Sequence, residues 1–557
     1  MENVLNRWKN SLAPKGSARF FQVFPWVWLI AAYCITFAVL TLYGRPYIDS
    51  DMSSEMILAD LLNQEGKIVT ANWWYSTEVR VFCLQLLYKV GLILFPQNWY
   101  AAQMFGQAIG TFILIVSYLY VGHGLHLKNC GAWSAIALVC PFSVCYIWYC
   151  LLGGYYLPHM ICLLAGVGAI LHMLQTKLQV RFWIHGVLLL TSSLLFGLNG
   201  LKGFMGFYIP LVLASIIALW LQWNAKPNEF PRAEGRLVIL SLTALATAGI
   251  GYLFYDRVIF PNVVVADYTN RIWNKFSWNR LLQKLVDFLS LFGYPIDASV
   301  GGSVPLFSVE GVLCSFGLVV AGAIVFSLFR LLVRWRELDP IQRLVPLLLA
   351  SVCVFQGGIF AWTGDLNDTS PYHWLTIVPL AFSVLQLEGE TEHLHIPNIR
   401  RVAALSFCVC IVIVSIGSTH RYFTSGFRVK PHLEEVCDWL VESGYTQGYS
   451  SFWNGNVLTE WSNGKIEMWV CASFSTMEAT QWLQKASHKE PPKGEIFLLT
   501  TIEELERKDL SNLYWWSNVV YEDKEEHVGN EEHYLIMVYD SYDDMMNAIG
   551  GARANAE

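Results

Sequence analysis

The fold is decided by the stretch WVWLIAAYCITFAVLTLYGRPYIDSDMSSEMILADLLNQEGKI, residues 26–68. Its first part, 26–43, is a nearly unbroken apolar run, and about 20 such residues allow a helix to cross the hydrocarbon core of a membrane. Four Lys and Arg residues precede this run, and no small-residue cleavage site follows it. Residues 26–43 are therefore predicted to form an uncleaved membrane anchor, with residues 1–25 in the cytoplasm.

The composition of the whole chain also indicates a membrane protein. Of its 557 residues, 54% are hydrophobic and 15% are charged, whereas a soluble protein carries about 25% charged residues. The chain holds 37 Lys and Arg and has a net charge of −7. These values exclude a cytosolic enzyme, a disordered regulator and a nucleic-acid binder, so the expected partners include the lipid bilayer but no nucleic acid.

The charges divide the chain into two parts. Residues 1–419 have a net charge of +5, whereas residues 420–557 hold 11 Lys and Arg against 23 Asp and Glu, a net of −12. This division predicts a transmembrane domain over 26–419 and a separate soluble domain over 420–557, which is long enough for one small domain.

Ten further apolar runs are predicted to span the membrane, which gives eleven spans in all. They are 101–121, 131–149, 156–174, 182–199, 203–222, 236–255, 305–329, 344–362, 371–387 and 401–418. The stretch 79–95 is apolar too, but it contains Arg80, Gln85 and Lys89. It is therefore predicted to be an amphipathic helix on the outer membrane surface.

The distribution of Lys and Arg sets the orientation of these spans. With 79–95 on the surface, the basic residues Arg330, Arg334, Arg336 and Arg343 share one side, and the opposite loops 150–155 and 363–370 have no Lys or Arg. Because cytoplasmic loops are enriched in Lys and Arg, this predicts a multi-pass cell-membrane protein with a cytoplasmic N-terminus and an extracytoplasmic C-terminal domain. Two sizeable loops, 44–100 and 256–304, then lie outside.

The C-terminal part has the pattern of a small α/β domain. Short apolar runs at 447–452, 466–471, 496–500 and 534–539 alternate with helical patterns at 432–443, 476–486 and 502–508. Cys437 and Cys471 are its only cysteines, and whether they form a disulfide stays open. The fold class predicted is an all-α polytopic membrane protein of about eleven transmembrane helices, followed by an extracytoplasmic α/β domain.

Acidic residues cluster directly after the first span. Asp49, Asp51 and Glu55 lie at the start of a helical pattern that begins at Ser50, and Glu78 precedes the surface helix. Such carboxylates can act as a general base on an incoming hydroxyl. Alternatively, Asp49 and Asp51 can hold a divalent cation such as Mg²⁺ or Mn²⁺. An ordinary capped helix explains the same residues without chemistry.

This layout resembles the GT-C superfamily of membrane glycosyltransferases, and within it the protein O-mannosyltransferases and the lipid A aminoarabinose transferases. Those proteins carry an acidic pair after the first span, matched here by Asp49 and Asp51, and a further acid before the second outer helix, matched by Glu78. The family pair is adjacent, whereas Ser50 separates the two acids here, and YSTEVRVF (75–82) replaces a Pro-Pro-rich entry. The motifs are specific only over 44–100, so the subfamily and the base stay open. Together with the tail segment FWNGNVLTEWSNGKIEMW (452–469), the YSTE variant resembles a group of bacterial membrane proteins.

The resemblance implies transfer of a sugar from a polyprenyl-phosphate donor to a glycan, lipid or protein acceptor on the outer membrane face. The alternatives are a transporter or flippase of lipid-linked saccharides, and an assembly factor or receptor. Transporters usually bury ionisable residues at mid-membrane. Here the span interiors are nearly free of charge and the acids follow the first span. This distribution favours chemistry at the surface.

Cations that could bind the donor phosphate occur in two segments. Arg257, Arg271 and Lys275 lie in the loop 256–304, and Lys202 lies in GLNGLKGF (197–204). The alternative for the loop is an interfacial helix anchored by Arg and Trp.

Several other polar residues are predicted to lie near the outer ends of spans. Glu55, His159 in GGYYLPHM, and Tyr372 and His373 in GDLNDTSPYHW are candidates for the donor pocket, although helix capping and core packing explain the last three as well. The segments WNGN (453–456) and SNGK (462–465) are predicted to be turns, the alternative being a sugar contact by Trp453.

Overall fold

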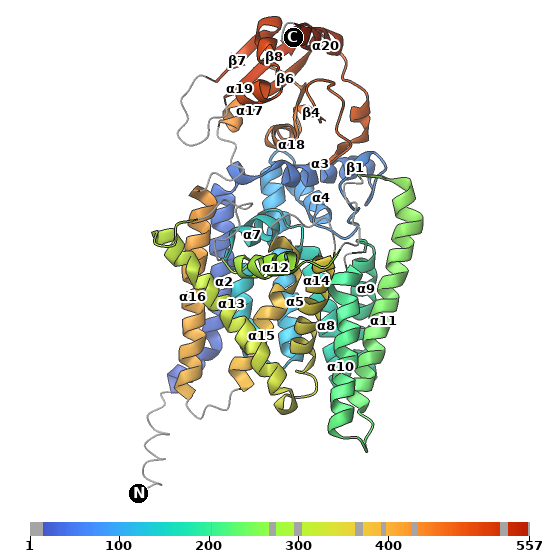
Figure 1. The fold of residues 1–557 in the computed structure, drawn as a ribbon, viewed down its shortest axis with the longest axis vertical. Helices are drawn as coiled ribbons and strands as arrows, with labels where there is room; N and C mark the ends of the chain where they lie inside the picture. The colour runs from blue at the N-terminus through green and yellow to red at the C-terminus, as the bar shows by residue number, and fades with distance from the viewer. Residues whose placement is uncertain are drawn as a thin grey trace.

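The computed structural model describes residues 15–201, 203–266, 275–293, 304–362, 371–391, 397–424, 432–523 and 533–554. A bundle of long helices forms one part of the molecule, and a smaller part with β-sheet, made from the end of the chain, lies above it (Figure 1). The prediction of a polytopic helical membrane protein followed by a C-terminal α/β part is confirmed.

Within the described ranges, nine helices are long and apolar enough to cross a membrane. They contain the elements α2 (Lys15–Tyr43), α5 (Trp99–Gly124), α8 (Leu157–Gln175), α9 (Gln179–Gly197), α10 (Ile209–Ala225), α11 (Arg232–Phe254), α13 (Val309–Val333), α14 (Leu344–Trp362) and α16 (Pro397–Thr424). Each coincides with a predicted span.

The predicted span 131–149 is not straight. It forms α6 (Ala132–Val139), α7 (Val144–Tyr146) and the π-helix η3 (Ile147–Leu152), and the chain bends by 94° between the first and the other two. The break falls at Pro141, because proline cannot continue a helix and disfavours helical geometry in the residue before it. Cys140 is accordingly extended, and the Ser143 side chain caps the new helix by accepting from the Tyr146 N–H.

Two other predicted helices are shorter than expected. The run 371–387 begins as the 3-10 helix η9 (Pro371–Ile377) and continues as α15 (Val378–Thr391), which has only 14 residues. The surface helix predicted over 79–95 is α4 (Gln85–Leu94), and the residues before it are not helical.

The C-terminal sheet has five strands in the order β4-β3-β6-β8-β7. They are β3 (Gln447–Ser451), β4 (Glu467–Cys471), β6 (Ile496–Thr501), β7 (Asn518–Glu522) and β8 (Tyr534–Tyr539). Strands β4, β3 and β6 are parallel, and β8 and β7 continue the sheet in antiparallel pairing. One face is covered by α17 (Leu433–Glu442) and α18 (Phe452–Trp461), and the other by α19 (Ile502–Arg507), η11 (Ser511–Trp516) and α20 (Tyr542–Ala554).

Some predictions for this part are wrong. The segment 476–486 is not a helix but an irregular stretch that contains the short strand β5 (Gln484–Lys485) and enters η10 (Ala486–Lys489). WNGN lies inside α18 instead of forming a turn, whereas SNGK does turn, with left-handed backbone at Asn463 and Gly464. Cys437 and Cys471 are both free thiols.

The C-terminal part is joined to the loops 44–100 and 256–304 by a small three-stranded sheet. Its order is β2-β1-β5, where β1 (Trp73–Tyr75) comes from the loop 44–100 and β2 (Val264–Val265) from the middle loop, 256–304. Each of the three strands therefore belongs to a different segment of the chain. In addition, α18 packs against α3 (Ser50–Glu65), so the acidic helix lies between the membrane helices and the C-terminal part (Figure 1).

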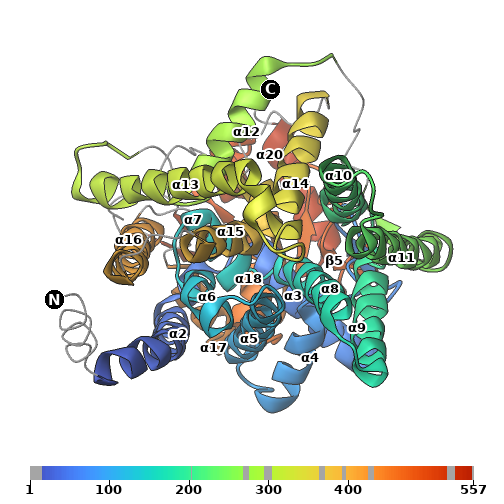
Figure 2. The same cartoon turned by 90° about the horizontal axis from the view of Figure 1, so that it is seen from below.

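The middle loop contributes one helix with an inverted arrangement of side chains. In α12 (Trp278–Ser290), Trp278, Leu282 and Leu285 are exposed, whereas Lys284 and Asp287 are buried and form an ion pair of 2.8 Å. This helix lies at the edge of the bundle (Figure 2). Apolar side chains on the outside and charges on the inside are what a helix needs when lipid surrounds it.

Candidate active site

Asp49 caps the acidic helix α3 and is almost fully buried, at 3% exposure. Its Oδ1 accepts a hydrogen bond from the Met52 N–H at 3.0 Å, and its Oδ2 accepts one from Trp148 Nε1 at 2.7 Å. Trp148 lies in η3, so the bend at Pro141 brings this indole to the start of α3. Asp49 therefore holds the start of α3 against η3, the segment that follows the bend at Pro141.

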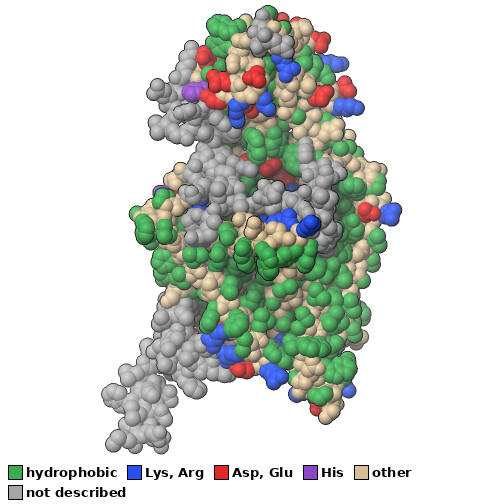
Figure 3. Space-filling model, in the orientation of Figure 1, with side chains coloured by type: hydrophobic (Ala, Val, Ile, Leu, Met, Phe, Trp, Pro, Cys, Tyr) green, Lys and Arg blue, Asp and Glu red, His purple; other side chains and the backbone are tan. Residues whose placement is uncertain are grey.

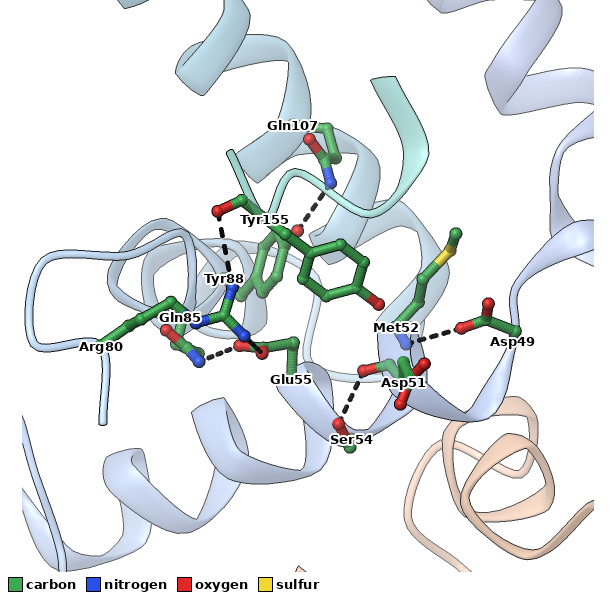
Figure 4. A network of polar contacts seen from close by, with 10 residues as sticks. All are labelled: Asp49, Asp51, Met52, Ser54, Glu55, Arg80, Gln85, Tyr88, Gln107 and Tyr155. Carbon is green, nitrogen blue, oxygen red and sulfur yellow. Dashed lines mark hydrogen bonds and ion pairs between the residues drawn. The ribbon is translucent and has the colours of Figure 1, made fainter. Parts of the chain in front are cut away.

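Asp51 lies in the first turn of α3 and is only half-buried. Its own backbone carbonyl accepts from the Ser54 hydroxyl at 2.6 Å. Figure 4 shows the ring of Tyr155 between the Arg80 guanidinium and the start of α3. Since Asp49 is buried and Asp51 is not, Asp51 is the more accessible acid of the predicted pair.

Tyr155 is the most informative residue that the sequence did not single out. Its hydroxyl is buried and has no hydrogen-bond partner in the described part of the chain. Burial raises the pKa of Tyr155 well above its usual value, and the negative charges of Asp49, Asp51 and Glu55 raise it further. The phenol therefore stays protonated, and it can donate a hydrogen bond next to the acidic helix. Its position in GGYY, in the short loop between the predicted spans 131–149 and 156–174, was the available signal.

Glu55 is held in a buried ion pair. Arg80 Nη2 lies 3.0 Å from Glu55 Oε1, and the Gln85 side-chain amide donates to Oε2 (Figure 4). Burial raises the pKa of Glu55, while Arg80 lowers it. Arg80 also lies over the Tyr155 ring, with Cζ 5.4 Å from the ring centroid, and Nη1 reaches the Tyr155 carbonyl at 3.5 Å. Both oxygens of Glu55 are thus engaged, and the pair positions Tyr155.

Glu78 is half-buried and lies beside the GLNG loop that follows α9. A Cβ atom added at Gly200 would be 3.8 Å from Glu78 Oε2, and the φ of +92° at Gly200 strains any other residue. Asn199 holds the two segments together, because its side chain accepts from the Phe82 N–H at 2.8 Å and donates to the Phe82 carbonyl at 2.7 Å. The structure therefore brings Glu78 to the segment that contains Lys202.

The predicted phosphate-binding cations are only partly described. Arg271 and Lys202 lie outside the described residues. The Arg257 side chain is 81% exposed and pairs with Asp256 at 3.4 Å, and Lys275 is exposed at the entry to α12. Figure 3 shows Asp and Glu side chains in the recess between the two parts of the molecule, with Lys and Arg below them and a band of hydrophobic side chains lower still.

The structure describes the side chain of only one of the remaining pocket candidates. His159 is 5% exposed and packs edge-on against Phe196, with 5.4 Å between the ring centroids. Tyr372 and His373 lie in η9, and their side chains are outside the described part.

A metal site at Asp49 and Asp51 has no support from the geometry. Among the described residues, no group of three or more His, Cys, Asp or Glu side chains is arranged to hold a metal ion. The donors around the Asp49 carboxylate are an amide N–H and an indole N–H, which is the environment of a helix cap.

Comparison with solved structures identifies the fold. Neither the protein-family models nor the curated proteins contain a match to this sequence. ArnT from Cupriavidus metallidurans bound to undecaprenyl phosphate is similar with a TM-score of 0.54 and 11% identity, over 93% of this chain and 98% of that one. Its apo form gives a TM-score of 0.51 and 10% identity, over 94% and 98%.

An oligosaccharyltransferase from Archaeoglobus fulgidus is also matched, with a TM-score of 0.49 and 11% identity over 91% of this chain and 74% of the other. The two ArnT structures cover nearly all of both chains and extend the similarity through the C-terminal part. The fold expected from the resemblance is confirmed: this chain has the architecture of the ArnT structures.

Proposed function

We propose that this chain is a membrane glycosyltransferase that moves a sugar from a polyprenyl-phosphate donor to an acceptor hydroxyl, with Asp51 as the general base. The observation that carries the proposal is the difference in burial among the three acids of this helix. Asp49 is 3% exposed and Glu55 is 7% exposed, whereas Asp51 is only half-buried and lies beside a protonated phenol. A base must be reachable by its substrate.

The reaction needs a proton acceptor and a place for a leaving phosphate. As the acceptor oxygen forms its bond to the anomeric carbon, its proton passes to the Asp51 carboxylate. The bond from that carbon to the phosphate oxygen breaks, and polyprenyl phosphate leaves with the electron pair. The Tyr155 hydroxyl can donate a hydrogen bond to a developing negative charge, and the Glu55–Arg80 pair holds its ring in place.

A lipid-linked donor is supported by the fold and by the arrangement of charge. The first ArnT structure was solved with undecaprenyl phosphate bound. In this chain, Lys275 and Arg257 are exposed on the middle loop, and Arg271 and Lys202 complete the proposed phosphate-binding set. Glu78 is proposed as a second acid of the same site. The acceptor class stays open among glycans, lipids and proteins.

The orientation is proposed from the two ends of the bundle. The acidic helix and the C-terminal part lie at one end (Figure 1), and the connection between α13 and α14, which contains Arg334 and Arg343, lies at the other, with Arg330 in the last turn of α13. Because basic connections face the cytoplasm, the site faces outward, where lipid-linked sugars and not nucleotide sugars are the available donors.

The test is transfer by the purified full-length chain in lipid nanodiscs, with polyprenyl-phosphate sugars as donors and a cell-envelope extract as acceptor. Asp51→Asn is expected to lower the rate by at least 100-fold, the lower range of general-base contributions. Asp60→Asn on the same helix is the matched control and should retain activity. An Asp51→Asn rate within threefold of the wild type would remove Asp51 as the base.

Transport is distinguished in the same preparation. A flippase would move a fluorescent lipid-linked saccharide across liposomes without changing its chemistry, and Asp51→Asn would abolish that movement. Movement with no new glycosidic product would replace the transferase proposal with the alternative.

A further inference from the structure

The C-terminal part contributes a buried carboxyl group to the interface with the acidic helix. Glu460 lies in the last turn of α18 and is 1% exposed. The same helix is fixed to α3 at its other end, where the Ser50 hydroxyl donates to the Phe452 carbonyl. Just beyond α18, the Asn463 side chain accepts from the Trp99 N–H at 2.8 Å. Glu460 is therefore enclosed by contacts between the two parts of the molecule.

The surroundings of Glu460 suit a neutral carboxyl group better than a charged one. Neither of its oxygens forms a hydrogen bond of normal geometry with a described residue. Its polar neighbour across the interface is Ser53, which is fully buried one turn after Asp49. A buried carboxylate without strong donors is costly, because it has left water without replacing its hydrogen bonds.

The titratable and charged groups around this site come from four elements of the membrane part. They are Arg45 in η1 (Arg45–Tyr47), Asp49 at the start of α3, Tyr88 in α4 and Tyr100 in α5. Arg45 is already paired with Glu434 and stacks on Trp461, with Cζ 5.8 Å from the ring centroid. Burial raises the pKa of Glu460 to about 7, Ser53 and Arg45 lower it, and Asp49 raises it.

We propose that Glu460 is a positioning residue: in its neutral form it seats the C-terminal part on α3 and so holds Asp51 in place against Tyr155. Loss of its proton puts a second negative charge near Asp49 and weakens this docking. The effect on sugar transfer rests on the function proposed above, whereas the effect on docking does not.

The sign of the pH dependence follows from the raised pKa. Docking is strongest below the usual Glu pKa of 4.5, where both the docked and the separated forms hold the proton. Between there and about 7, only the docked form holds it, so the docking equilibrium falls by about tenfold per pH unit. Above about 7 it is constant and weakest.

Docking can be measured without any substrate. The N–H groups of Leu483 and Ala486 donate to the carbonyls of Trp74 and Asn72, so their protection from hydrogen exchange reports contact between the two parts. The experiment compares protection factors at pH 5, 6, 7 and 8.5 for the full chain in nanodiscs, in the wild type, Glu460→Gln and Glu460→Ala. Glu442→Gln, an exposed acid of the same domain, is the matched control.

In the wild type and in Glu442→Gln, protection should fall at least tenfold from pH 5 to pH 7. Glu460→Gln should show no such fall, and at pH 8.5 it should be better protected than the wild type. Glu460→Ala should be less protected at every pH, because it leaves a cavity. In the transfer assay, Glu460→Gln should keep the wild-type KM for the donor and remove the decline of kcat between pH 5 and pH 7.

Protection in Glu460→Gln that follows the wild type at every pH would overturn the inference, even if transfer is observed. If the exchange results are as expected but no form of the chain transfers sugar, then the docking role stands and the proposed function fails.

Discussion

Replacing Arg80 with Gln should be one of the most destabilising single changes outside the membrane helices. Glu55 is 7% exposed in the native chain, and the substitution leaves its carboxylate with the Gln85 amide as a hydrogen-bond partner. Removing one partner of a buried ion pair typically costs about 3–5 kcal/mol, because the other charge is left without compensation. The 3.0 Å pair and the contact of Arg80 with the Tyr155 ring place this site in that range.

The assay is reversible unfolding of the purified chain in mixed micelles, followed by tryptophan fluorescence. Glu55→Gln/Arg80→Gln should recover at least half of the loss, since the double variant carries no uncompensated charge. Without Arg80, the charge that lowers the pKa of Glu55 is gone, and burial raises that pKa further. The loss should therefore appear as the pH rises and be smallest in acid.

Arg257→Gln is the matched control. Arg257 forms an ion pair with Asp256 as well, but its side chain is 81% exposed, and exposed pairs contribute about 0–1 kcal/mol. If Arg80→Gln costs no more than Arg257→Gln, or if the double variant is less stable than Arg80→Gln, then the pair does not act as a buried, mutually compensating unit.

Three further outcomes are expected. Asp49→Ala removes the cap of α3 and the partner of the Trp148 indole, and should cost about 2–4 kcal/mol in the same unfolding assay; a loss below 0.5 kcal/mol would contradict the assigned contacts. Gly200→Ala should reduce transfer without changing expression, because the φ of +92° is strained for alanine, whereas Gly249→Ala, in open space within α11, should have no effect. A hydrogen bond from His488 and the charge of Lys485 lower the pKa of Glu467 to about 2 although burial opposes them. The stabilisation by Glu467 should therefore be complete above about pH 4.5 and disappear as the pH falls toward 2, and exchange protection of Ala486 in Glu467→Gln should lose that acid transition.

Much of the membrane part could be predicted because hydrophobic length is a local property. A run of about 20 apolar residues has few alternatives to a membrane helix, and nine of the predicted spans coincide with long helices. The strands β3, β4, β6 and β8 were also predicted, since each is a short apolar run between turn residues. Two predictions failed at the local level. Pro141 bends the span predicted over 131–149, and WNGN, predicted to be a turn, lies inside the helix α18.

The site was predicted only in part, because local sequence patterns do not show which distant segments come into contact. The sequence alone determined that Asp49, Asp51 and Glu55 lie just after the first span and that Glu78 precedes the surface helix, and the resemblance to the GT-C pattern followed from that order. Only the tertiary structure distinguished them, because Trp148 engages Asp49, Arg80 engages Glu55 and α18 covers the same helix. Arg80 is 25 residues from Glu55 along the chain. Phe452 of α18, which accepts a hydrogen bond from Ser50, is 402 residues from it. Burial and hydrogen bonding between such residues set which carboxylate stays accessible, and they arise only when the chain has folded.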